Sequence, residues 1–309
     1  MTIPVILLHR KGQARMGGKI MRCDQLAAIC NRSLGQRYSF SVQSLLNNPG
    51  PARDAGIRAL TGAVVIGLKG VFQNLSAAEM KQIKSTSLAV GMDYLDMTAR
   101  RLFAPDFVDF HISASVSGQR HLVACAKRDR QATGRVFYLP HHWDPRLTRQ
   151  KPQQDQWAVA YFGRVENAHI PETARSLLTQ PDYGKDSDFG QVLAQMCRTP
   201  LHYAVRPELG AATAPLKPFT KGFNAAACGA NIICTADTTD AIHYLGKDYP
   251  YLLPDSSDAT ILDCLARAKD DFGGPVWNDA LDRMQMLRKR TAPRMVARHM
   301  GKILDQVLA

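Results

Sequence analysis

The sequence has no long hydrophobic run and no cluster of cysteines. No apolar stretch approaches the roughly 18 to 20 residues that a membrane-spanning helix needs. The short apolar segment near the start, residues 3–8, predicts a buried strand and not a signal peptide. The 7 cysteines are scattered without CxxC pairs or Cys/His ligand spacing, which predicts reduced thiols in a cytoplasmic protein and no structural zinc site.

Motifs of two large functional classes are also missing. No GxGxxG sequence follows a predicted strand, which counts against a nicotinamide-dependent oxidoreductase. No helix-turn-helix, zinc-finger or RNP-type pattern occurs, and few aromatic residues lie among the basic ones. Nucleic acid is therefore not the expected partner.

Acidic residues are scarce in the first half of the chain. Residues 1–150 contain 21 Lys and Arg against 9 Asp and Glu, whereas residues 151–309 contain 18 of each. This asymmetry predicts an anionic partner for the first half, either a membrane surface or an acidic or phosphorylated acceptor. A basic face that is merely solvated is the alternative.

Predicted strands and helices alternate along the chain, as in parallel sheets covered on both faces. In the first half the strands are residues 3–8, 38–45, 62–68, 88–92, 108–112 and 136–139, and the helices are 21–34, 76–85 and 117–130. After a break the pattern restarts with a strand at 157–162, helices at 171–180 and 187–197, a strand at 201–205 and a helical tail over 257–270 and 276–307. We therefore predict an α/β fold with domains at 1–143 and 157–309, joined by a polar linker at 144–156.

A phosphate-binding pattern spans residues 217–235. Pro218 suits an early helical position, so Lys217 and Lys221 are expected on one face at the start of a helix, beside the Thr220 hydroxyl. The first N–H groups of a helix lack internal acceptors and carry partial positive charge, so an anion fits there. Gly229 is expected to end the helix before a buried strand at 232–234. The alternative is an ordinary helix–strand unit with a solvated lysine pair.

Polar residues follow that strand. Asp237 and Thr238 lie just beyond its carboxyl end, where open α/β sheets bind their ligands. We therefore include both residues in the candidate site.

The order of three motifs resembles the GT-B glycosyltransferases. Residues 139–144, LPHHWD, stand where the first domain of that family often closes, Gly163-Arg164 ends the strand that opens the second domain, and residues 225–234 match a small-residue helix followed by an apolar strand. The resemblance covers most of the chain in order. It implies two Rossmann-like domains that face each other across a cleft, with a helical C-terminal tail.

The resemblance also implies an activity, the transfer of a sugar from a nucleotide-sugar donor held by the second domain to an acceptor held by the first. The acceptor would be a glycan, a lipid-linked molecule or another group of the cell-surface type, and the basic first half favours an anionic or membrane-associated one. The departing diphosphate needs fixed positive charge and N–H donors. The expected donor-binding residues are Arg164, Lys217, Thr220, Lys221, Asn224, Asp237 and Thr238. The nucleotide sugar is a substrate, and we expect no cofactor and no metal.

Two departures from the family pattern leave the donor and the stereochemical outcome open. Many retaining members carry a lysine shortly after the Gly-Arg pair, whereas Glu166, Asn167 and His169 follow here. Many also have a glutamate on the small-residue helix, where Asn224 stands in this chain. For Arg164, the alternative to a donor contact is an ion pair with Glu166.

Candidates for catalysis in the first domain are carboxylates near strand and helix ends. Asp93 and Asp24 are the predicted general bases of an inverting reaction, with His9 and His111 also considered. Each has a structural alternative, as a turn residue, a helix-entry charge or a buried core histidine. The expected acceptor or cleft residues are Gly17, Gly18, His141 and His142.

The main alternative function is a non-catalytic GT-B-like protein that binds an anionic polymer or a membrane surface through its basic first half. The basic tail segments at 276–307 carry apolar residues at helical spacing, which predicts helices with one buried face. In the resembling family the last helix often crosses back onto the first domain. Contact with a membrane is the competing role, and the expected location is cytoplasmic, with or without peripheral attachment to the inner membrane.

Overall fold

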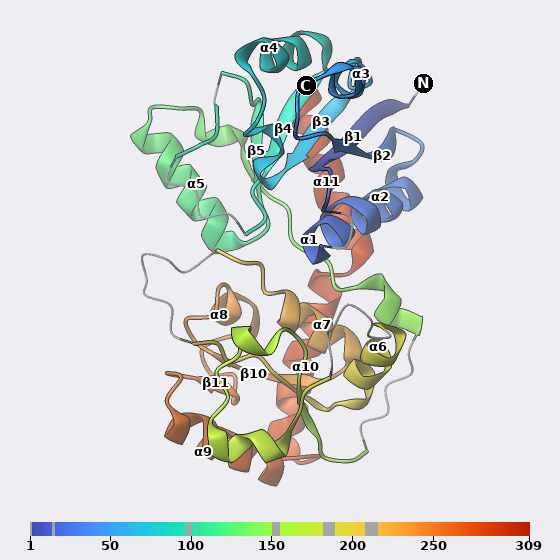
Figure 1. Ribbon diagram of the computed structural model, residues 1–309. Helices are drawn as coiled ribbons and strands as arrows, with labels where there is room; N and C mark the ends of the chain where they lie inside the picture. The colour runs from blue at the N-terminus through green and yellow to red at the C-terminus, as the bar shows by residue number, and fades with distance from the viewer. Residues whose placement is uncertain are drawn as a thin grey trace. The chain divides into compact units, whose positions relative to one another are not determined.

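The computed structural model describes residues 2–13, 16–96, 101–104, 106–149, 155–181, 189–207 and 216–309. The chain forms two compact units (Figure 1). Unit 1 comprises Met1–His141, Pro215–Pro218 and Pro293–Ala309, and unit 2 comprises His142–Ala214 and Phe219–Ala292.

Unit 1 is built on a parallel six-stranded sheet with the order β2-β1-β3-β4-β5-β6. Its strands are β1 (Ile3–Arg10), β2 (Tyr38–Leu45), β3 (Val64–Leu68), β4 (Ala89–Asp93), β5 (Phe110–Ser113) and β6 (Val136–Tyr138). The central strands β3, β4 and β5 are buried along their whole length, which explains the mostly apolar sequences of β3 and β4. The edge strand β2 begins with alternating buried and exposed residues, as its polar alternation predicted.

Helices cover both faces of this sheet (Figure 1). They are α1 (Gly17–Lys19), a π-helical turn η1 (Ile20–Gln25), α2 (Leu26–Leu34), α3 (Pro51–Arg58), η2 (Lys69–Phe72), α4 (Ala77–Thr86), α5 (Val116–Arg128), η3 (Thr133–Arg135) and α11 (Pro293–Leu308). Alternate residues of β1 belong to opposite cores: Val5 and Leu7 pack with α2 and α11, whereas Ile6 and Leu8 pack with α3, α4 and α5. Ser76 and Glu79 form a capping box at the start of α4: the Ser76 hydroxyl accepts from the Glu79 N–H, and the Glu79 carboxylate accepts from the Ser76 N–H.

Unit 2 contains a parallel five-stranded sheet with the order β11-β10-β9-β7-β8. Its strands are β7 (Val159–Tyr161), β8 (Leu178–Thr179), β9 (Leu201–Tyr203), β10 (Asn231–Thr235) and β11 (Leu252–Leu253). Its helices are η4 (Pro145–Arg149), η5 (Val165–Asn167), η6 (Glu172–Leu177), α6 (Phe189–Arg198), α7 (Thr220–Cys228), α8 (Ala241–Leu245), α9 (Asp258–Asp270) and α10 (Pro275–Arg290). A single apolar cluster joins them.

The prediction of a helix over 171–180 is wrong. Only residues 172–177 are helical, as the 3-10 turn η6, and Leu178 and Thr179 pair with β7 as the edge strand β8. This segment has too few apolar residues to form the buried face of a helix, so its last residues instead pair with β7 at the edge of the sheet.

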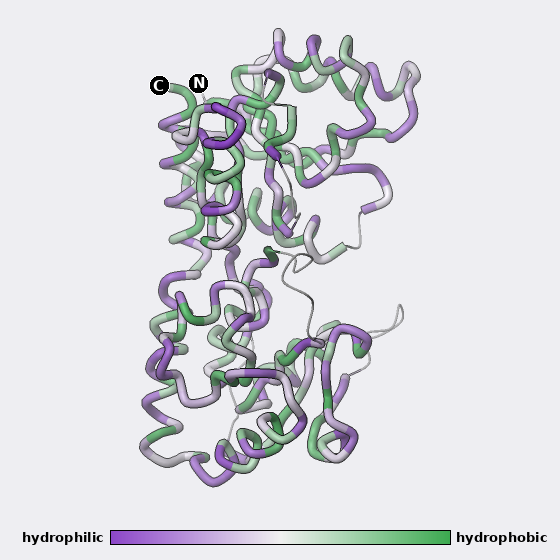
Figure 2. Tube along the Cα trace, turned by 90° about the vertical axis from the view of Figure 1, so that its left-hand side faces the viewer, coloured by the Kyte–Doolittle hydropathy of each residue, from purple (hydrophilic) through white to green (hydrophobic). Residues whose placement is uncertain are grey.

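The tail divides between the two units. Helix α10 belongs to unit 2, whereas α11 packs in unit 1. The predicted assignment of all residues 157–309 to the second domain is therefore wrong for residues 293–309 and also for 215–218, which include Lys217, and residues 142–143 of the predicted first domain belong to unit 2. The buried face of α11 carries Val296, Met300 and Leu304, and a Cβ at Gly301 would lie 3.2 Å from Leu34 of α2. Figure 2 shows hydrophobic and hydrophilic residues alternating along this helix, which confirms its predicted amphipathic character.

Part of the predicted linker is ordered structure. Residues 145–149 form the turn η4 within unit 2, and the Asp144 carboxylate accepts hydrogen bonds from Arg146. The polar, proline-containing segment 144–156 is therefore not a flexible linker over its full length, because hydrogen bonds between the Asp144 and Arg146 side chains order its first part.

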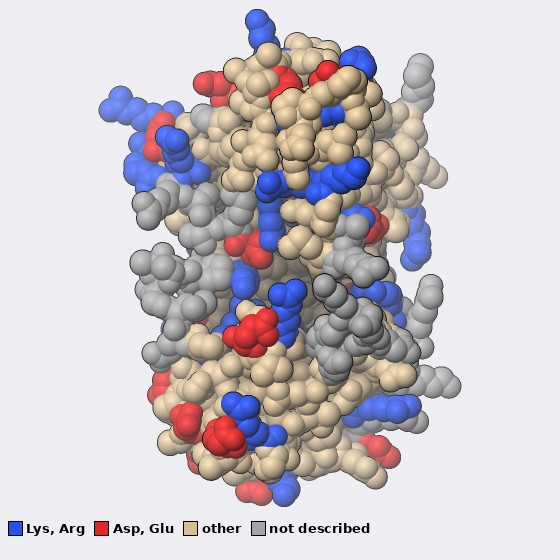
Figure 3. All heavy atoms as spheres, in the orientation of Figure 1, with Lys and Arg blue, Asp and Glu red and all other residues tan. Residues whose placement is uncertain are grey.

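Positive charge is concentrated in unit 1. Its ranges contain 23 Lys and Arg against 9 Asp and Glu, whereas those of unit 2 contain 16 against 18. Basic side chains of unit 1 are visible in Figure 3. Among the described residues, no helix combines the length and the hydropathy of a membrane-spanning segment.

Candidate functional site

In unit 2, the strand order reverses at β7. Strand β8 pairs on one side of β7, and the chain then crosses to place β9 on the other side. In open α/β sheets, ligands bind outside the carboxyl ends of the strands at such a switch point. The loops that leave β7 and β9, together with the start of α7, therefore define the candidate site of this unit.

Helix α7 begins later than the sequence predicted. It starts at Thr220, after Phe219 with a ψ of 46°, so Pro218 and Lys217 precede the helix and Lys217 does not share a helical face with Lys221. The Phe219 ring is buried, stacks on Tyr244 at 6.2 Å, and occupies the space that a Cβ at Gly222 would need. This packing fixes the entry to the helix. The predicted left-handed end at Gly229 is confirmed, with a φ of 72°.

Lys221 lies against the turn that follows β7. Its Nζ is 3.5 Å from the centroid of the Tyr161 ring and is shielded from solvent. A Cβ at Gly163 would lie 2.9 Å from the same nitrogen, so only glycine allows this approach. The Tyr161 hydroxyl donates to the Arg164 carbonyl at 2.9 Å, which holds the turn in place. The structure thus brings together the Gly163-Arg164 turn and Lys221, as predicted for this pair of motifs.

Two further residues near Lys221 were missed by sequence reasoning. Burial, with a contribution from the Lys221 charge, lowers the pKa of His202 to about 4, so this imidazole is neutral at physiological pH. Arg206, beyond the carboxyl end of β9, is close enough to Tyr161 to lower the pKa of its hydroxyl, although burial raises that pKa overall. The only sequence signal for Arg206 was its place directly after a predicted strand.

The other predicted donor-site residues of unit 2 are more exposed. The side chain of Arg164 is 80% exposed, and its Nη1 lies 4.0 Å from Glu166 Oε1, a pair that contributes little in water. Asp237 is exposed at the end of β10, and the Thr238 hydroxyl lies 3.1 Å from that of Thr235. Arg164 therefore remains available to an anionic ligand.

Asn224 has a structural contact. Its Oδ1 accepts a hydrogen bond of 2.9 Å from the backbone N–H of Asp144. The side chain therefore anchors the segment that enters unit 2. The predicted role of Asn224 in donor binding would have to compete with this bond.

In unit 1, Asp93 is part of a buried ion pair. It lies at the end of β4; its Oδ2 accepts from Arg22 Nε at 2.8 Å and lies 2.6 Å from Arg22 Nη2, while its Oδ1 accepts from the Leu95 N–H. Arg22 also donates to the carbonyls of Leu139 and Pro140. Both charged side chains are nearly inaccessible, at 1% and 5% exposed. The geometry therefore favours a structural role for Asp93, tying β4 to η1 and to the end of β6.

The π-helical turn η1 aims Arg22 inward. The predicted helix at 21–34 is observed as the continuous helical segment α1, η1 and α2, and its π turn buries Arg22 and Cys23. Such turns widen a helix by one residue and are frequent at functional sites. Asp24, on the same turn, is bonded to Lys19 at 2.8 Å and is 41% exposed, so it is the more accessible of the two candidate bases.

The start of this helical segment contains the two predicted glycines. A Cβ at Gly18 would lie 2.8 Å from Leu95, whereas one at Gly17 would meet nothing within 4 Å. Gly18 is thus required for close packing, and Gly17 is exposed at the helix start. Leu95 itself has a φ of 51°, a left-handed conformation that is strained for a leucine.

The four candidate histidines of unit 1 and of the segment that follows it are buried. Burial lowers the pKa of His111 to about 4, and its Nδ1 lies 3.1 Å from the Tyr94 hydroxyl, as in the core-histidine alternative. The Nδ1 of His9 lies 2.8 Å from the Arg10 carbonyl, and that of His142 lies 2.9 Å from the Trp143 carbonyl. His141 is 2% exposed. These positions favour structural roles over proton transfer to a substrate.

No group of three metal-ligating side chains occurs in the part of the chain that the structure describes. Residues 182–188 and 208–215 lie outside that part.

Comparison with known proteins gives similarity at the level of the fold. No protein-family model matches the chain, and no curated protein matches it. Among solved structures, Anabaena HepE in complex with UDP and glucose has a TM-score of 0.64 at 10% identity over 98% of this chain and 100% of that chain. A glycosyltransferase from Rickettsia africae has a TM-score of 0.62 at 9% identity, and sucrose-phosphate synthase from Thermosynechococcus elongatus 0.60 at 13%, each over 99% of both chains. The predicted α/β fold of the GT-B type is thereby confirmed.

Proposed function

We propose that this protein is a glycosyltransferase that uses a nucleotide-sugar donor. Unit 2 binds the donor and unit 1 the acceptor. The observation that carries the proposal is the placement of Lys221 against Gly163 at the start of α7, at the switch point of the unit 2 sheet. The GT-B-type fold supports it, because similar structures include HepE in complex with UDP and with UDP-glucose.

The chemistry of sugar transfer requires stabilisation of a departing diphosphate. In the proposed reaction, the bond between the anomeric carbon and the diphosphate oxygen breaks, and the electron pair leaves with that oxygen. The ammonium of Lys221 and the N-terminus of α7 supply positive charge there. Because water does not screen Lys221 Nζ, its charge acts strongly on a nearby anion. Arg164 and Arg206 are proposed to bind the same group with their planar guanidinium donors.

The acceptor carries the nucleophile. We propose Asp24 as the general base of an inverting reaction, since it is partly exposed whereas Asp93 is held by Arg22. The net positive charge of unit 1 favours an anionic or membrane-associated acceptor at the cytoplasmic face of a membrane. The reaction as proposed needs no cofactor and no metal.

The test is release of UDP from UDP-glucose and UDP-galactose, followed with a coupled assay in the presence of candidate glycan and lipid-linked acceptors. The proposal predicts UDP release that depends on one of these donors. A protein that binds acidic polymers in a salt-dependent manner, with neither donor binding nor UDP release, would instead be the non-catalytic binding protein.

The Gly163 turn gives a prediction for donor binding. Gly163→Ala places a Cβ 2.9 Å from both Lys221 Nζ and the Tyr161 hydroxyl oxygen, so the lysine has to move. We expect the affinity for UDP to fall about tenfold or more, and the free energy of unfolding to fall by about 1–3 kcal/mol. Calorimetric titration with UDP and urea denaturation measure the two effects. Gly134→Ala is the control, because a Cβ there meets nothing within 4 Å; equal UDP affinity in both variants would contradict the role of the turn.

A further inference from the structure

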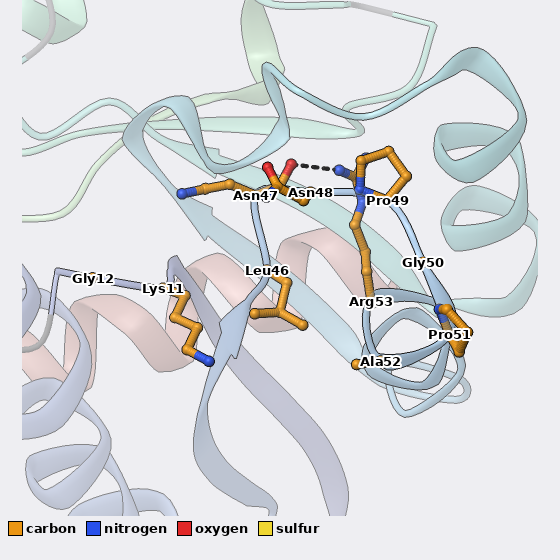
Figure 4. Close-up of a pocket in the computed structure, with 10 residues that line it drawn as sticks. All are labelled: Lys11, Gly12, Leu46, Asn47, Asn48, Pro49, Gly50, Pro51, Ala52 and Arg53. Atoms are coloured by element: carbon orange, nitrogen blue, oxygen red, sulfur yellow. Dashed lines mark hydrogen bonds between the residues drawn. The ribbon is translucent and has the colours of Figure 1, made fainter.

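Unit 1 contains a pocket that the proposed donor site does not include. Its volume is about 520 Å³, in the range of small-molecule sites. Figure 4 shows that the lining comes from three segments: Lys11 and Gly12 after β1, residues 46–50 after β2, and the first turn of α3. The pocket therefore lies at the carboxyl ends of two parallel strands, where α/β sheets bind ligands.

The first turn of α3 presents backbone donors to this pocket. Gly50, with a φ of 142°, precedes the helix and has no side chain to cap it. Pro51 has no N–H, and the Asp54 N–H bonds to the Gly50 carbonyl, so the N–H groups of Ala52 and Arg53 have no acceptor within the helix. Ala52 and Arg53 both line the pocket. A helix start of this kind favours an anion.

Positive charge and the absence of carboxylates add to this preference. Lys11 lines the pocket and is exposed, so its ammonium can turn to a ligand. None of the ten described residues that line the pocket is acidic, and Asp54, the acidic residue of the same helical turn, is not among them.

A buried arginine forms one wall of the pocket. Arg53 is 1% exposed and donates to the carbonyls of Asn47 and Asn74 at 2.8 and 2.7 Å and to Glu79 at 2.6 Å. Its Nε is also buried and has no hydrogen-bond partner among the described residues. Figure 4 shows the Arg53 side chain running from α3 to the loop at Asn47, so the ion-paired arginine holds this loop against the helix. The pocket is therefore preformed.

The pocket has more room than an inorganic anion needs. The exposed side chains of Asn47 and Asn48 line it, and an amide both donates and accepts hydrogen bonds, as sugar hydroxyls require. The Asn47 Oδ1 is oriented by Arg10 Nε at 3.3 Å. Lys11 and the two N–H groups together provide three hydrogen-bond donors in the lining, enough for the terminal oxygens of a phosphate monoester.

We propose that this pocket binds a phosphate monoester. Phosphate binding in this pocket does not depend on nucleotide-sugar binding in unit 2. The further assignment of the pocket as the acceptor site rests on the proposed function. The phosphate monoester can belong to a soluble sugar phosphate or to the headgroup of phosphatidic acid, and the experiment separates these sources.

The test is calorimetric titration of the full chain with glucose 6-phosphate, inorganic phosphate and glucose. We expect binding of glucose 6-phosphate that is at least tenfold tighter than binding of glucose. Ala52→Glu places a carboxylate in the pocket and suits the first turn of a helix, so the fold is retained while the affinity falls tenfold or more. Lys11→Gln should weaken binding similarly. Ala55→Glu and Lys81→Gln, at exposed positions outside the pocket, should leave the affinity within twofold.

A vesicle arm assigns the source of the phosphate. If the protein sediments with phosphatidic acid vesicles and Ala52→Glu abolishes this binding, but does not equally reduce binding to phosphatidylglycerol vesicles, the natural ligand is a lipid phosphate monoester. Equal affinities for glucose and glucose 6-phosphate, or unchanged glucose 6-phosphate binding in Ala52→Glu, would overturn the proposal. If Lys221→Met loses UDP binding but still binds glucose 6-phosphate, this pocket is distinct from the donor site.

Discussion

Lys221→Met lowers kcat/KM for UDP release from the preferred donor by about 10²- to 10³-fold, the usual effect of removing one group that stabilises charge in the transition state. Methionine keeps an apolar chain against the Tyr161 ring, so the packing of the turn is retained. Only the ammonium is lost. Steady-state kinetics at saturating acceptor measure the change.

The control for this variant is Lys247→Met, which removes an exposed lysine of the same unit. Its kcat/KM should stay within twofold of the wild-type value. Circular dichroism of both variants should match that of the wild type. Full activity of the Lys221→Met enzyme would show that the Lys221 charge does not stabilise the departing diphosphate, contrary to the proposed role of this residue.

Asp93→Asn lowers the free energy of unfolding by about 3–5 kcal/mol, because it leaves the Arg22 guanidinium buried without a counter-charge. Replacing both residues, as Arg22→Met with Asp93→Leu, should recover most of that loss, since no buried charge remains. Urea denaturation of the three proteins measures these values. The comparison also separates a structural carboxylate from a catalytic one.

The matched control is Asp129→Asn, which breaks the exposed pair between Asp129 and Arg128 and should cost no more than about 1 kcal/mol. Unchanged stability of Asp93→Asn, together with loss of UDP release, would contradict the structural role and restore Asp93 as the general base.

Most strands of both sheets could be predicted because their signal is local, whereas the two-residue edge strands β8 and β11 are too short to carry one. Segments 64–68 and 231–235 are buried along their whole length; the first is entirely apolar and the second contains the apolar run 232–234, so these patterns need no knowledge of the partner strand. The same holds for α11, whose buried face is visible in its periodicity. Its place in unit 1 cannot be read from this periodicity, because an apolar face does not reveal what it covers; only the family resemblance, in which the last helix often crosses back onto the first domain, indicated it.

The site depended on contacts that local sequence does not contain. The start of α7 is set by the Phe219 ring over Gly222 and against Tyr244, a tertiary arrangement that outweighed the helix-start signal of Pro218. Arg22 and Asp93 are 71 positions apart, so their pairing could not be seen in either segment. The association of the Gly163-Arg164 turn with Lys221 was foreseen only through the family resemblance.

The most direct test of the account is a crystal structure of the full chain with bound UDP. We expect diphosphate oxygens within about 3 Å of the backbone N–H groups at the start of α7, with Lys221 or Arg164 as a second donor. UDP bound away from α7, or failure of UDP and UDP-sugars to bind at millimolar concentration, would contradict the proposed donor site.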